Sequence, residues 1–364
     1  MTQGGPTLFG LMHARTRAQS QSPIPKDGRR LTDRQEKRIM QLARQCSVSG
    51  GNGTFVPLGR IAPGKGVKVS CNGSVSFAKH ERDMLSKMCR FGAAPAPGPL
   101  LYSPDGNPRV PRAFLFMDVV DGKTLRVFVN SDTHTAKPLS PKQRLELCLD
   151  TVRTVQILHR HNVVHNDLKL GNIMARLARR GARKTAKIII IDFGSAQSKK
   201  NHNKTAMAGT PFYTAPLTKK DRQTPDITFE RKIDKEIWAL QLVVLCLLTQ
   251  TAIEKSAFFR DIDYHHPFTS VMRAIELEQK PELLLERCAE IETQLRHAGF
   301  SKAFSKKFPK LFIKYCNDEP CALDLEAMLR QELGQAIKKE RAHQISTCTL
   351  TLEPKRQALK SVNS

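Results

Sequence analysis

The sequence predicts an α+β fold of two lobes: a small β-rich N-terminal lobe with one main helix and a larger, mainly helical C-terminal lobe. Three observations predict it. Short β-prone runs lie between Gly- and Pro-rich turns before residue 120, one amphipathic stripe interrupts them, and helical spacing of apolar residues dominates after residue 123. The 364 residues match two to three domains of about 150 residues, or one large two-lobed unit.

The chain begins with a segment, residues 1–30, that is polar, basic and punctuated by Gly, Pro and Ser. Such a composition predicts a disordered basic tail. Residues 31–45 are predicted to form an N-terminal helix, because Thr32 is a suitable N-cap and Gln35 stands at the capping-box position.

The predicted small lobe spans residues 46–120. The segment 63–66, Pro-Gly-Lys-Gly, predicts a hairpin turn, and an apolar stripe over 75–89 predicts the one main helix. The β-prone runs are Val48, Phe55–Ile61, Val67–Ser70, Leu100–Tyr102 and Val110–Met117.

The predicted large lobe spans residues 121–341. A helix is expected to start at Ser140, an N-cap followed by a first-turn proline. Two short strands, 163–164 and 187–191, are expected around a basic insert, and helices are expected to dominate from 232. Residues 342–364 are predicted to be a C-terminal tail.

The charge balance bounds the partners. Lys and Arg number 59 against 34 Asp and Glu, which gives a net charge of +25. This field favours acidic or phosphate-rich partners in a salt-dependent manner. Because only 6% of the residues are aromatic and none interleave with basic runs, we expect contact with nucleic acid only through non-specific electrostatics.

The hydropathy pattern predicts no membrane segment. The longest apolar run covers 13 positions, whereas a membrane helix needs about 20, and the first 30 residues lack a signal-peptide core. Nine cysteines without a Cys-x-x-Cys pair indicate a reducing compartment. An intracellular location, nucleus or cytoplasm, is therefore expected, and the oligomeric state stays open.

The strongest chemical signal is the run His-Asn-Asp-Leu-Lys-Leu-Gly-Asn over 165–172, with Asp-Phe-Gly beginning 20 residues after Asn172. Phosphoryl transfer uses such a set. Asp167 would orient an attacking hydroxyl, and Lys169 would neutralise charge on the moving phosphoryl group. Asn172 and Asp192 would hold Mg²⁺ through the hard oxygen ligands that it prefers.

With these motifs in order, the chain resembles the eukaryotic-type protein kinase superfamily over roughly residues 46–330. The segment 209–216, Gly-Thr-Pro-Phe-Tyr-Thr-Ala-Pro, is similar to the end of that family's activation segment. The resemblance implies a two-lobed protein-kinase-like fold, Mg²⁺ and ATP, and transfer of the γ-phosphoryl group to protein substrates. Lys169 and Thr210 favour Ser/Thr over Tyr as the acceptor.

The resemblance also assigns residues in the small lobe. Gly51 and Gly53 look like the phosphate-covering loop, where glycine lets backbone N–H groups approach phosphate closely. Lys68 would bind the α- and β-phosphates and pair with Glu81. Lys65 and Lys79 are rival candidates, and the alternative for Lys68 and Glu81 is a pair of solvated surface charges.

Residues 114–122 resemble the family's fifth strand and hinge. Met117 would control access behind the adenine, and the Asp118 and Val120 backbones would pair with the adenine edge. Without the other motifs, such an apolar strand ending in Asp-Gly would be interpreted as an ordinary strand of the hydrophobic core.

Several positions depart from the family pattern. Asn166 stands where many members have an arginine that receives an activation-loop phosphate, so little dependence on phosphorylation of Thr205 is expected. Leu217 and Leu323 stand where a buried Glu–Arg ion pair is usual, a replacement that can be neutral in stability.

Two further departures lie in a predicted central helix, where Glu236 replaces the usual Asp and Gln241 the usual Gly. They indicate altered support of the catalytic loop.

Substrate choice is predicted from the absence of carboxylates. Family members that select arginine upstream of the acceptor carry acidic residues at positions that here are Thr124, Gly171 and Cys246. With basic residues instead in the segment that would face the substrate, a preference for acidic or phosphorylated protein substrates is expected.

Other functions remain open. A pseudokinase scaffold is disfavoured because the four catalytic-site residues are present, and a small-molecule phosphotransferase is disfavoured by the 209–216 segment. His159, His161 and His165 could form a metal site, but two of them flank the catalytic loop, which explains them better.

The basic insert, Arg176 to Lys187, holds six Lys or Arg in 12 residues. It is read either as a nuclear-import or phosphate-docking patch or as a solvated hairpin tip. The insert, the small N-terminal lobe and the motif drift also resemble divergent kinases of large DNA viruses such as herpesviruses, which would place the protein in a host cell.

Overall fold

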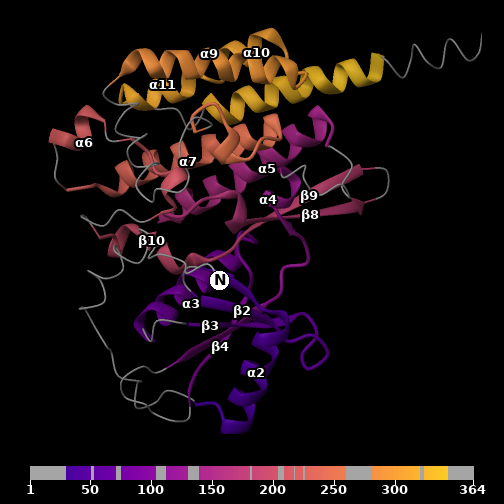
Figure 1. The fold of residues 1–364 in the computed structure, drawn as a ribbon, viewed down its shortest axis with the longest axis vertical. Helices are drawn as coiled ribbons and strands as arrows, with labels where there is room; N and C mark the ends of the chain where they lie inside the picture. Colours follow the sequence, from indigo (N-terminus) through magenta and orange to yellow (C-terminus); the bar gives the residue numbers. More distant parts are fainter. Residues whose placement is uncertain are drawn as a thin grey trace, which may run out of the picture.

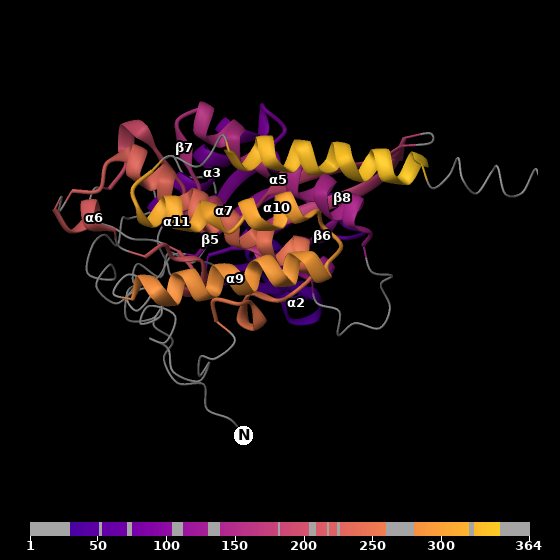
Figure 2. The same ribbon diagram turned by 90° about the horizontal axis from the view of Figure 1, so that it is seen from above.

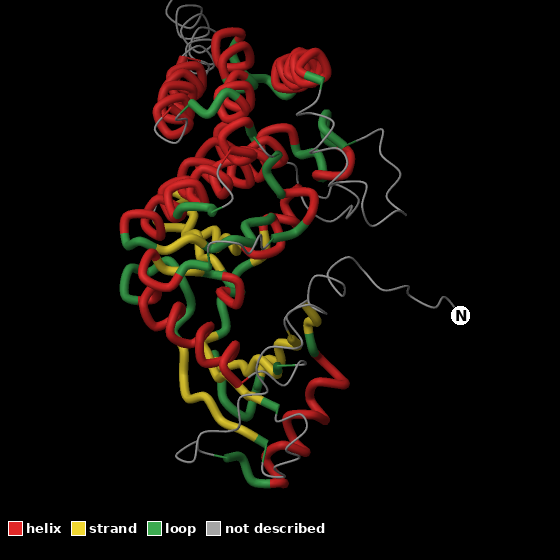
Figure 3. Tube along the Cα trace, turned by 90° about the vertical axis from the view of Figure 1, so that its left-hand side faces the viewer, coloured by secondary structure: helices red, strands yellow, loops and turns green. Residues whose placement is uncertain are grey.

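The computed structural model describes residues 30–50, 53–70, 75–103, 112–129, 139–180, 183–203, 209–216, 218–223, 226–259, 280–319 and 324–342. Figure 1 shows a sheet-containing part with α2 and α3 next to a larger helical part. In Figure 3 the strands gather mainly in the smaller part and the helices in the larger. The predicted α+β class, an N-terminal antiparallel sheet followed by a helical region, is confirmed. The predicted tails lie outside the described residues except at their inner ends: Arg30 forms a β-bridge with Tyr102, and Ala342 ends a helix.

The small part is built on a five-stranded antiparallel sheet with the order β1-β2-β3-β5-β4. Its strands are β1 (Val48–Gly50), β2 (Gly53–Pro57), β3 (Lys65–Val69), β4 (Pro97–Tyr102) and β5 (Ala113–Asp118). The predicted second strand ends earlier than expected, at Pro57, because residues 58–65 form the hairpin turn: the Leu58 and Lys65 backbones are bonded, as are those of Ile61 and Leu58. The expected turn between β4 and β5 lies outside the described residues.

Helix α2 (Asp33–Cys46) covers one face of this sheet, and its predicted capping box between Thr32 and Gln35 is present. The helix packs on an apolar cluster separate from the main core. The buried residues of this cluster are Leu31, Ile39, Val56, Leu58, Val67, Val69 and Phe114.

Helix α3 (Val75–Cys89) is the predicted main helix of the small part and contacts β4 and β5. The buried residues of this helix recur at helical spacing, and Glu81 is one of them. Leu85 and Met88, on the same side of the helix, are fully buried. This packing fixes Glu81 against the sheet.

The larger part is organised around two long helices, α5 (Pro141–Arg160) and α7 (Phe229–Thr249). As predicted, α5 starts at a Ser140 N-cap with proline in its first turn. Nearly every residue of α7 from Glu236 to Leu248 is buried, so it is the central helix of this part.

Further helices surround this pair. Helices α4 (Leu125–Val129), α9 (Pro281–His297) and α11 (Lys310–Cys316) contact α7, and α10 (Lys302–Lys307) packs against α9 and α11. The short α6 (Lys219–Gln223) lies at one end of the molecule (Figure 2). A helix over 324–342 runs antiparallel to α5, joined by the ion pairs Lys142–Glu340 and Arg153–Glu326.

The described residues of the basic insert belong to two long paired strands, β8 (Ile173–Arg180) and β9 (Arg183–Ile190), and β8 also pairs with the short β6 (Lys123–Thr124). Strand β9 starts earlier than the short strand predicted over 187–191, because residues 183–186 of the insert also pair with β8. The other predicted strand, β7 (Val163–Val164), pairs instead with β10 (Gln197–Ser198). Within the described residues, no helix is both long and apolar enough to span a bilayer.

Candidate active site

Lys68 and Lys65 lie on opposite faces of β3, because successive side chains of a strand alternate. Lys65 shares its face with the α2 cluster and pairs with Asp118 at the exposed edge. Lys68 points to the α3 side, where its Nζ donates to both oxygens of Glu81, at 2.7 and 2.9 Å. Lys79, the other rival, is exposed on α3.

The Lys68 ammonium has a second carboxylate partner, since its Nζ lies 2.6 Å from Oδ1 of Asp192. The alternative of solvated surface charges does not describe this pair, because the Lys68 and Glu81 side chains are only 13% and 4% exposed. Burial alone would lower the pKa of Lys68, but the two carboxylates raise it further than burial lowers it. The ammonium is therefore charged at neutral pH.

The two carboxylates respond differently to this environment. Burial raises the pKa of Glu81, and Lys68 only partly opposes that effect. For Asp192, burial again acts to raise the pKa, but the charge and hydrogen bond of Lys68 outweigh it and the net pKa is lowered. Asp192 is thus held as an anion beside the cation.

The catalytic-loop residues form a compact set around Asp167, whose side chain is 4% exposed. Thr210 donates its hydroxyl hydrogen to Asp167 Oδ1 across 2.7 Å. Lys169 Nζ lies 2.8 Å from both Asp167 Oδ2 and Thr210 Oγ1. A carboxylate, an ammonium and a hydroxyl thus meet at one point.

Asn172 completes the set. Its Nδ2 donates to the Asp167 carbonyl oxygen and to Oδ2, both across 2.9 Å. Because the nitrogen makes both bonds, the amide oxygen is the atom available as a metal ligand. Together with the Asp192 carboxylate it offers the hard oxygens that Mg²⁺ prefers, and the donor chemistry therefore fits this ion.

Glu236 of α7 holds the catalytic loop by a hydrogen bond to its backbone. Its Oε2 accepts from the Asn166 backbone N–H at 2.7 Å, and its Oε1 lies 2.8 Å from Nε2 of His159. The longer glutamate thus reaches the loop backbone and also holds a side chain of α5. Sequence reasoning missed His159 in this role, because the two partners are 77 positions apart.

Asn166 itself adopts a left-handed backbone conformation, with φ 62°, which asparagine tolerates better than most residues. Its side-chain amide donates to the Ser195 carbonyl oxygen across 2.9 Å. The position therefore links the catalytic loop to the segment after Asp192.

The three histidines considered as a metal site have separate partners. His159 contacts Glu236, His161 stacks on Phe91 with ring centroids 3.5 Å apart, and His165 Nε2 lies 3.0 Å from the Ile191 carbonyl oxygen. Among the described residues, no group of three or more His, Cys, Asp and Glu side chains is gathered as a metal site.

The expected nucleotide-side positions lie at different ends of the sheet, Gly53 near Val69 and Asp118 opposite Lys65. Gly53 has a positive φ of 150°, and a Cβ there would lie 2.6 Å from the Val69 carbonyl oxygen, so the close approach of β2 and β3 requires glycine. Asp118 ends β5, with its N–H bonded to the Ala96 carbonyl oxygen, and Val120 follows at the junction between the two parts. Gly51 lies outside the described residues.

Other positions singled out from the sequence, namely Thr205, Leu217 and Leu323, also lie outside the described residues. Gln241 is described and fully buried in α7.

A pocket of about 60 Å³ adjoins Asp167 on the side of the 209–216 segment. Its wall contains Thr210, Tyr213 and Ala215, and α7 contributes Lys232 and Lys235. The Asp167 carboxylate therefore borders a recess that is lined by two basic side chains and also by Glu236.

The geometry agrees with the comparison against known families. A model of the protein kinase domain matches residues 109–322, more than half of the chain. The chain therefore belongs to the protein kinase domain family.

Individual kinases are similar to about a third of the chain. Serine/threonine-protein kinase PknB of Mycolicibacterium smegmatis is 31% identical over 115 residues, 30% of this chain and 17% of that protein. PknB of Mycobacterium tuberculosis is 30% identical over 115 residues, again 30% of this chain and 17% of that protein. Serine/threonine-protein kinase ste20 of Aspergillus oryzae is 31% identical over 136 residues, 36% of this chain and 14% of that protein.

The matches thus span less than a fifth of the length of these relatives. These three relatives are bacterial and fungal, and they give no support to the suggested resemblance to kinases of large DNA viruses.

Proposed function

We propose that the protein is a serine/threonine protein kinase that transfers the γ-phosphoryl group of ATP to hydroxyls of protein substrates. The observation that carries this proposal is the contact of Asp167 with the Thr210 hydroxyl at 2.7 Å, with Lys169 bonded to both. The Thr210 hydroxyl already donates a hydrogen bond to the Asp167 carboxylate. A substrate Ser or Thr would present the same kind of hydroxyl to this carboxylate.

Each residue of the set has a defined task in this proposal. Asp167 orients the acceptor hydroxyl through a hydrogen bond. Lys169 places a positive charge beside the reacting oxygen. Asn172 and Asp192 would hold Mg²⁺, which when bound supplies neutralisation of charge on phosphate oxygens.

The small part would hold the nucleotide. Lys68, kept in place by Glu81, would contact the phosphates. Gly53, with Gly51 before it, would bring backbone N–H groups close to them, and the backbones of Asp118 and Val120 would bind the adenine edge.

Protein substrates are favoured over small molecules by the 209–216 segment. It is held at Thr210 by the catalytic loop, and its rings are packed: Tyr213 is buried and Phe212 meets Phe259 edge-on at 5.3 Å. This segment lines the pocket beside Asp167, so an extended peptide can bind next to that carboxylate.

A pseudokinase scaffold is the second candidate function. It is disfavoured because Asp167, Lys169, Asn172 and Asp192 are all present.

The test is incubation of the purified full-length protein with labelled ATP, Mg²⁺ and a protein mixture, followed by phosphoamino-acid analysis. Label on Ser and Thr that disappears without Mg²⁺ and with Asp167→Asn supports the proposal. Nucleotide binding without transfer would instead identify a scaffold, and label confined to small molecules would identify a different phosphotransferase.

A further inference from the structure

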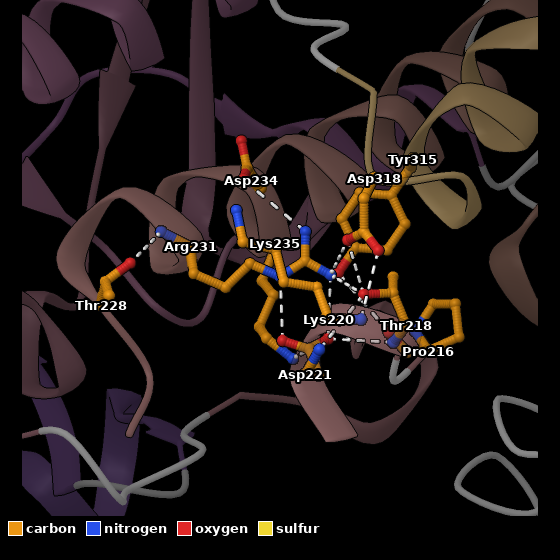
Figure 4. Close-up of polar contacts among 10 residues, drawn as sticks. All are labelled: Pro216, Thr218, Lys220, Asp221, Thr228, Arg231, Asp234, Lys235, Tyr315 and Asp318. Carbon is orange, nitrogen blue, oxygen red and sulfur yellow. Dashed lines mark hydrogen bonds and ion pairs between the residues drawn. The ribbon is translucent and has the colours of Figure 1, made fainter. Parts of the chain in front are cut away.

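A buried polar cluster surrounds the guanidinium of Arg231 in the first turns of α7 (Figure 4). It gathers side chains from α6, α7 and the end of α11, together with the residues that follow the 209–216 segment. The charged and hydroxyl members are Thr218, Asp221, Arg231, Asp234, Lys235, Tyr315 and Asp318. Apart from Lys235, which also lines the pocket beside Asp167, these residues lie outside the candidate active site described above.

Arg231 is the centre of this cluster. Its Nε and Nη2 donate to the two oxygens of Asp221 at 2.8 and 2.9 Å, the forked geometry of a strong ion pair. The same Nη2 donates to Thr218 Oγ1 at 2.6 Å and lies 3.1 Å from an oxygen of Asp318. The Arg231 side chain is only 8% exposed and that of Asp221 4%.

The cluster closes on itself through Thr218. After accepting from Arg231, the Thr218 hydroxyl donates to Asp318 at 2.6 Å, and the Thr218 N–H donates to Asp221. The Arg231 guanidinium also lies over the Tyr315 ring, 5.1 Å from its centroid, and the Tyr315 hydroxyl is directed at the Pro216 carbonyl oxygen. Figure 4 shows these groups gathered around Thr218, with Pro216 beside it.

The segment 209–216 is therefore held at both ends. At its start, Thr210 is bonded to Asp167 and Lys169. At its end, Pro216 and Thr218 are tied to the Arg231 cluster. Both ends also depend on α7, since Glu236, five positions after Arg231, bonds the catalytic loop.

We propose that Arg231 is a positioning residue for substrate binding: through Thr218 and Tyr315 it fixes the far end of the 209–216 segment, and with it the wall against which a protein substrate lies. This inference rests on the proposed function, because it assigns a task within protein phosphorylation.

Arg231→Met tests the proposal, with Arg144→Met as the matched control. Arg144 is likewise buried, lies over an aromatic ring (Phe300, 5.2 Å) and donates to the backbone carbonyls of Leu248 and Ala298 in the same part of the molecule. Its bonds reach the far end of α7 and not the 209–216 segment. Loss of Arg144 thus reports general destabilisation.

Kinetics in which each substrate is varied in turn while the other is saturating separate the two roles. Arg231→Met should raise the KM for a protein or peptide substrate by about tenfold or more and leave the KM for ATP within about twofold, because a wall of the substrate site is loosened while the nucleotide side is untouched. Arg144→Met should move the two KM values together, if at all. Equal shifts of both KM values in Arg231→Met, or an unchanged substrate KM, would overturn the inference.

Gentler variants cover the case in which Arg231→Met does not fold. Thr218→Val and Tyr315→Phe each remove one hydroxyl, and hydrogen–deuterium exchange of residues 209–218 measures the segment directly. We expect faster exchange there than in the wild type, with α5 unchanged. Unchanged exchange of the segment in both variants would overturn the inference.

The outcomes also separate this inference from the proposed function. If wild-type protein transfers no phosphoryl group to any protein, the proposed function fails. If the wild type is active and the Arg231 variant keeps its substrate KM and its exchange pattern, only the positioning role fails.

Discussion

The side-chain amide of Asn166 donates to the Ser195 carbonyl oxygen across 2.9 Å, so the catalytic loop and the segment after Asp192 are joined by a neutral hydrogen bond. A short amide cannot form the forked pair that an arginine makes with phosphate. The link is made instead to the protein backbone, where no modification is needed to complete it.

Thr205→Ala is therefore expected to keep most of the wild-type phosphoryl-transfer rate. The measurement is the initial rate with a protein substrate, with the protein treated beforehand with phosphatase as a parallel sample. A loss of more than about tenfold that Thr205→Glu restores would show that another cation reads a phosphate at this position.

Asp167→Asn is expected to lower kcat by roughly 10²–10⁴-fold, the usual contribution of a positioned proton acceptor. The amide matches the carboxylate in shape, so the melting temperature should change little. Retention of more than half of the wild-type turnover would contradict the role given to this residue.

Asp192→Asn should act on the nucleotide side and weaken Mg²⁺-dependent binding of ATP, because it removes a charged oxygen ligand. It also takes one carboxylate from Lys68, whose Nζ lies 2.6 Å from Asp192. Titration of ATP with and without Mg²⁺ measures the effect. Equal affinities for wild type and variant under both conditions, with equal turnover, would refute it.

Protein substrates with acidic or phosphorylated residues near the acceptor should be preferred. The recess beside Asp167 is bordered by Lys232 and Lys235, and burial raises the pKa of the Cys246 thiol, so that position adds no negative charge. A positional peptide library at two salt concentrations measures the preference, which should weaken as salt rises. Selection of arginine two or three positions before the acceptor would disprove it.

Acid should weaken the Arg231 cluster only at low pH. Burial acts to raise the pKa of Asp221, but hydrogen bonds from Arg231 and from the Thr218 N–H outweigh it and lower the pKa to about 2. A carboxyl with a lowered folded-state pKa contributes stability that is complete above its unfolded pKa, near 3.8, and is lost as the pH falls through the folded value. Urea unfolding from pH 6 to pH 2, with Asp221→Asn as reference, should show the stability gap between the proteins narrowing only below about pH 4. A gap that already closes at pH 5 would contradict this assignment.

The parts of the fold and site that sequence predicts are those encoded locally. The cap at Thr32 follows from residues three positions apart, the cap at Ser140 from the adjacent proline, and the set around Asp167 from a run of eight residues. From the sequence, Lys68 could be chosen over Lys65 only by the resemblance. The structure separates them, because side chains of β3 alternate between the two faces of the sheet and only the face of Lys65 is covered by α2.

Contacts between distant elements were not predictable in the same way. Glu236 and His159 are 77 positions apart and meet because α5 and α7 pack side by side, which no local pattern encodes. The Arg231 cluster was missed for the same reason. The sequence indicated that the usual ion pair is lost at Leu217 and Leu323. It gave no indication that Arg231 binds Thr218, the residue after Leu217.

Helix α2 has a practical consequence for anyone who shortens this chain. A recombinant fragment that starts at Val48 would keep Lys68, Glu81 and the entire catalytic loop. Its sheet, however, would present Val56, Val67 and Phe114 to water, the residues that α2 covers. Contiguous apolar surface of this kind promotes aggregation. A workable expression boundary therefore lies before Leu31, well ahead of residue 109, where the family match begins.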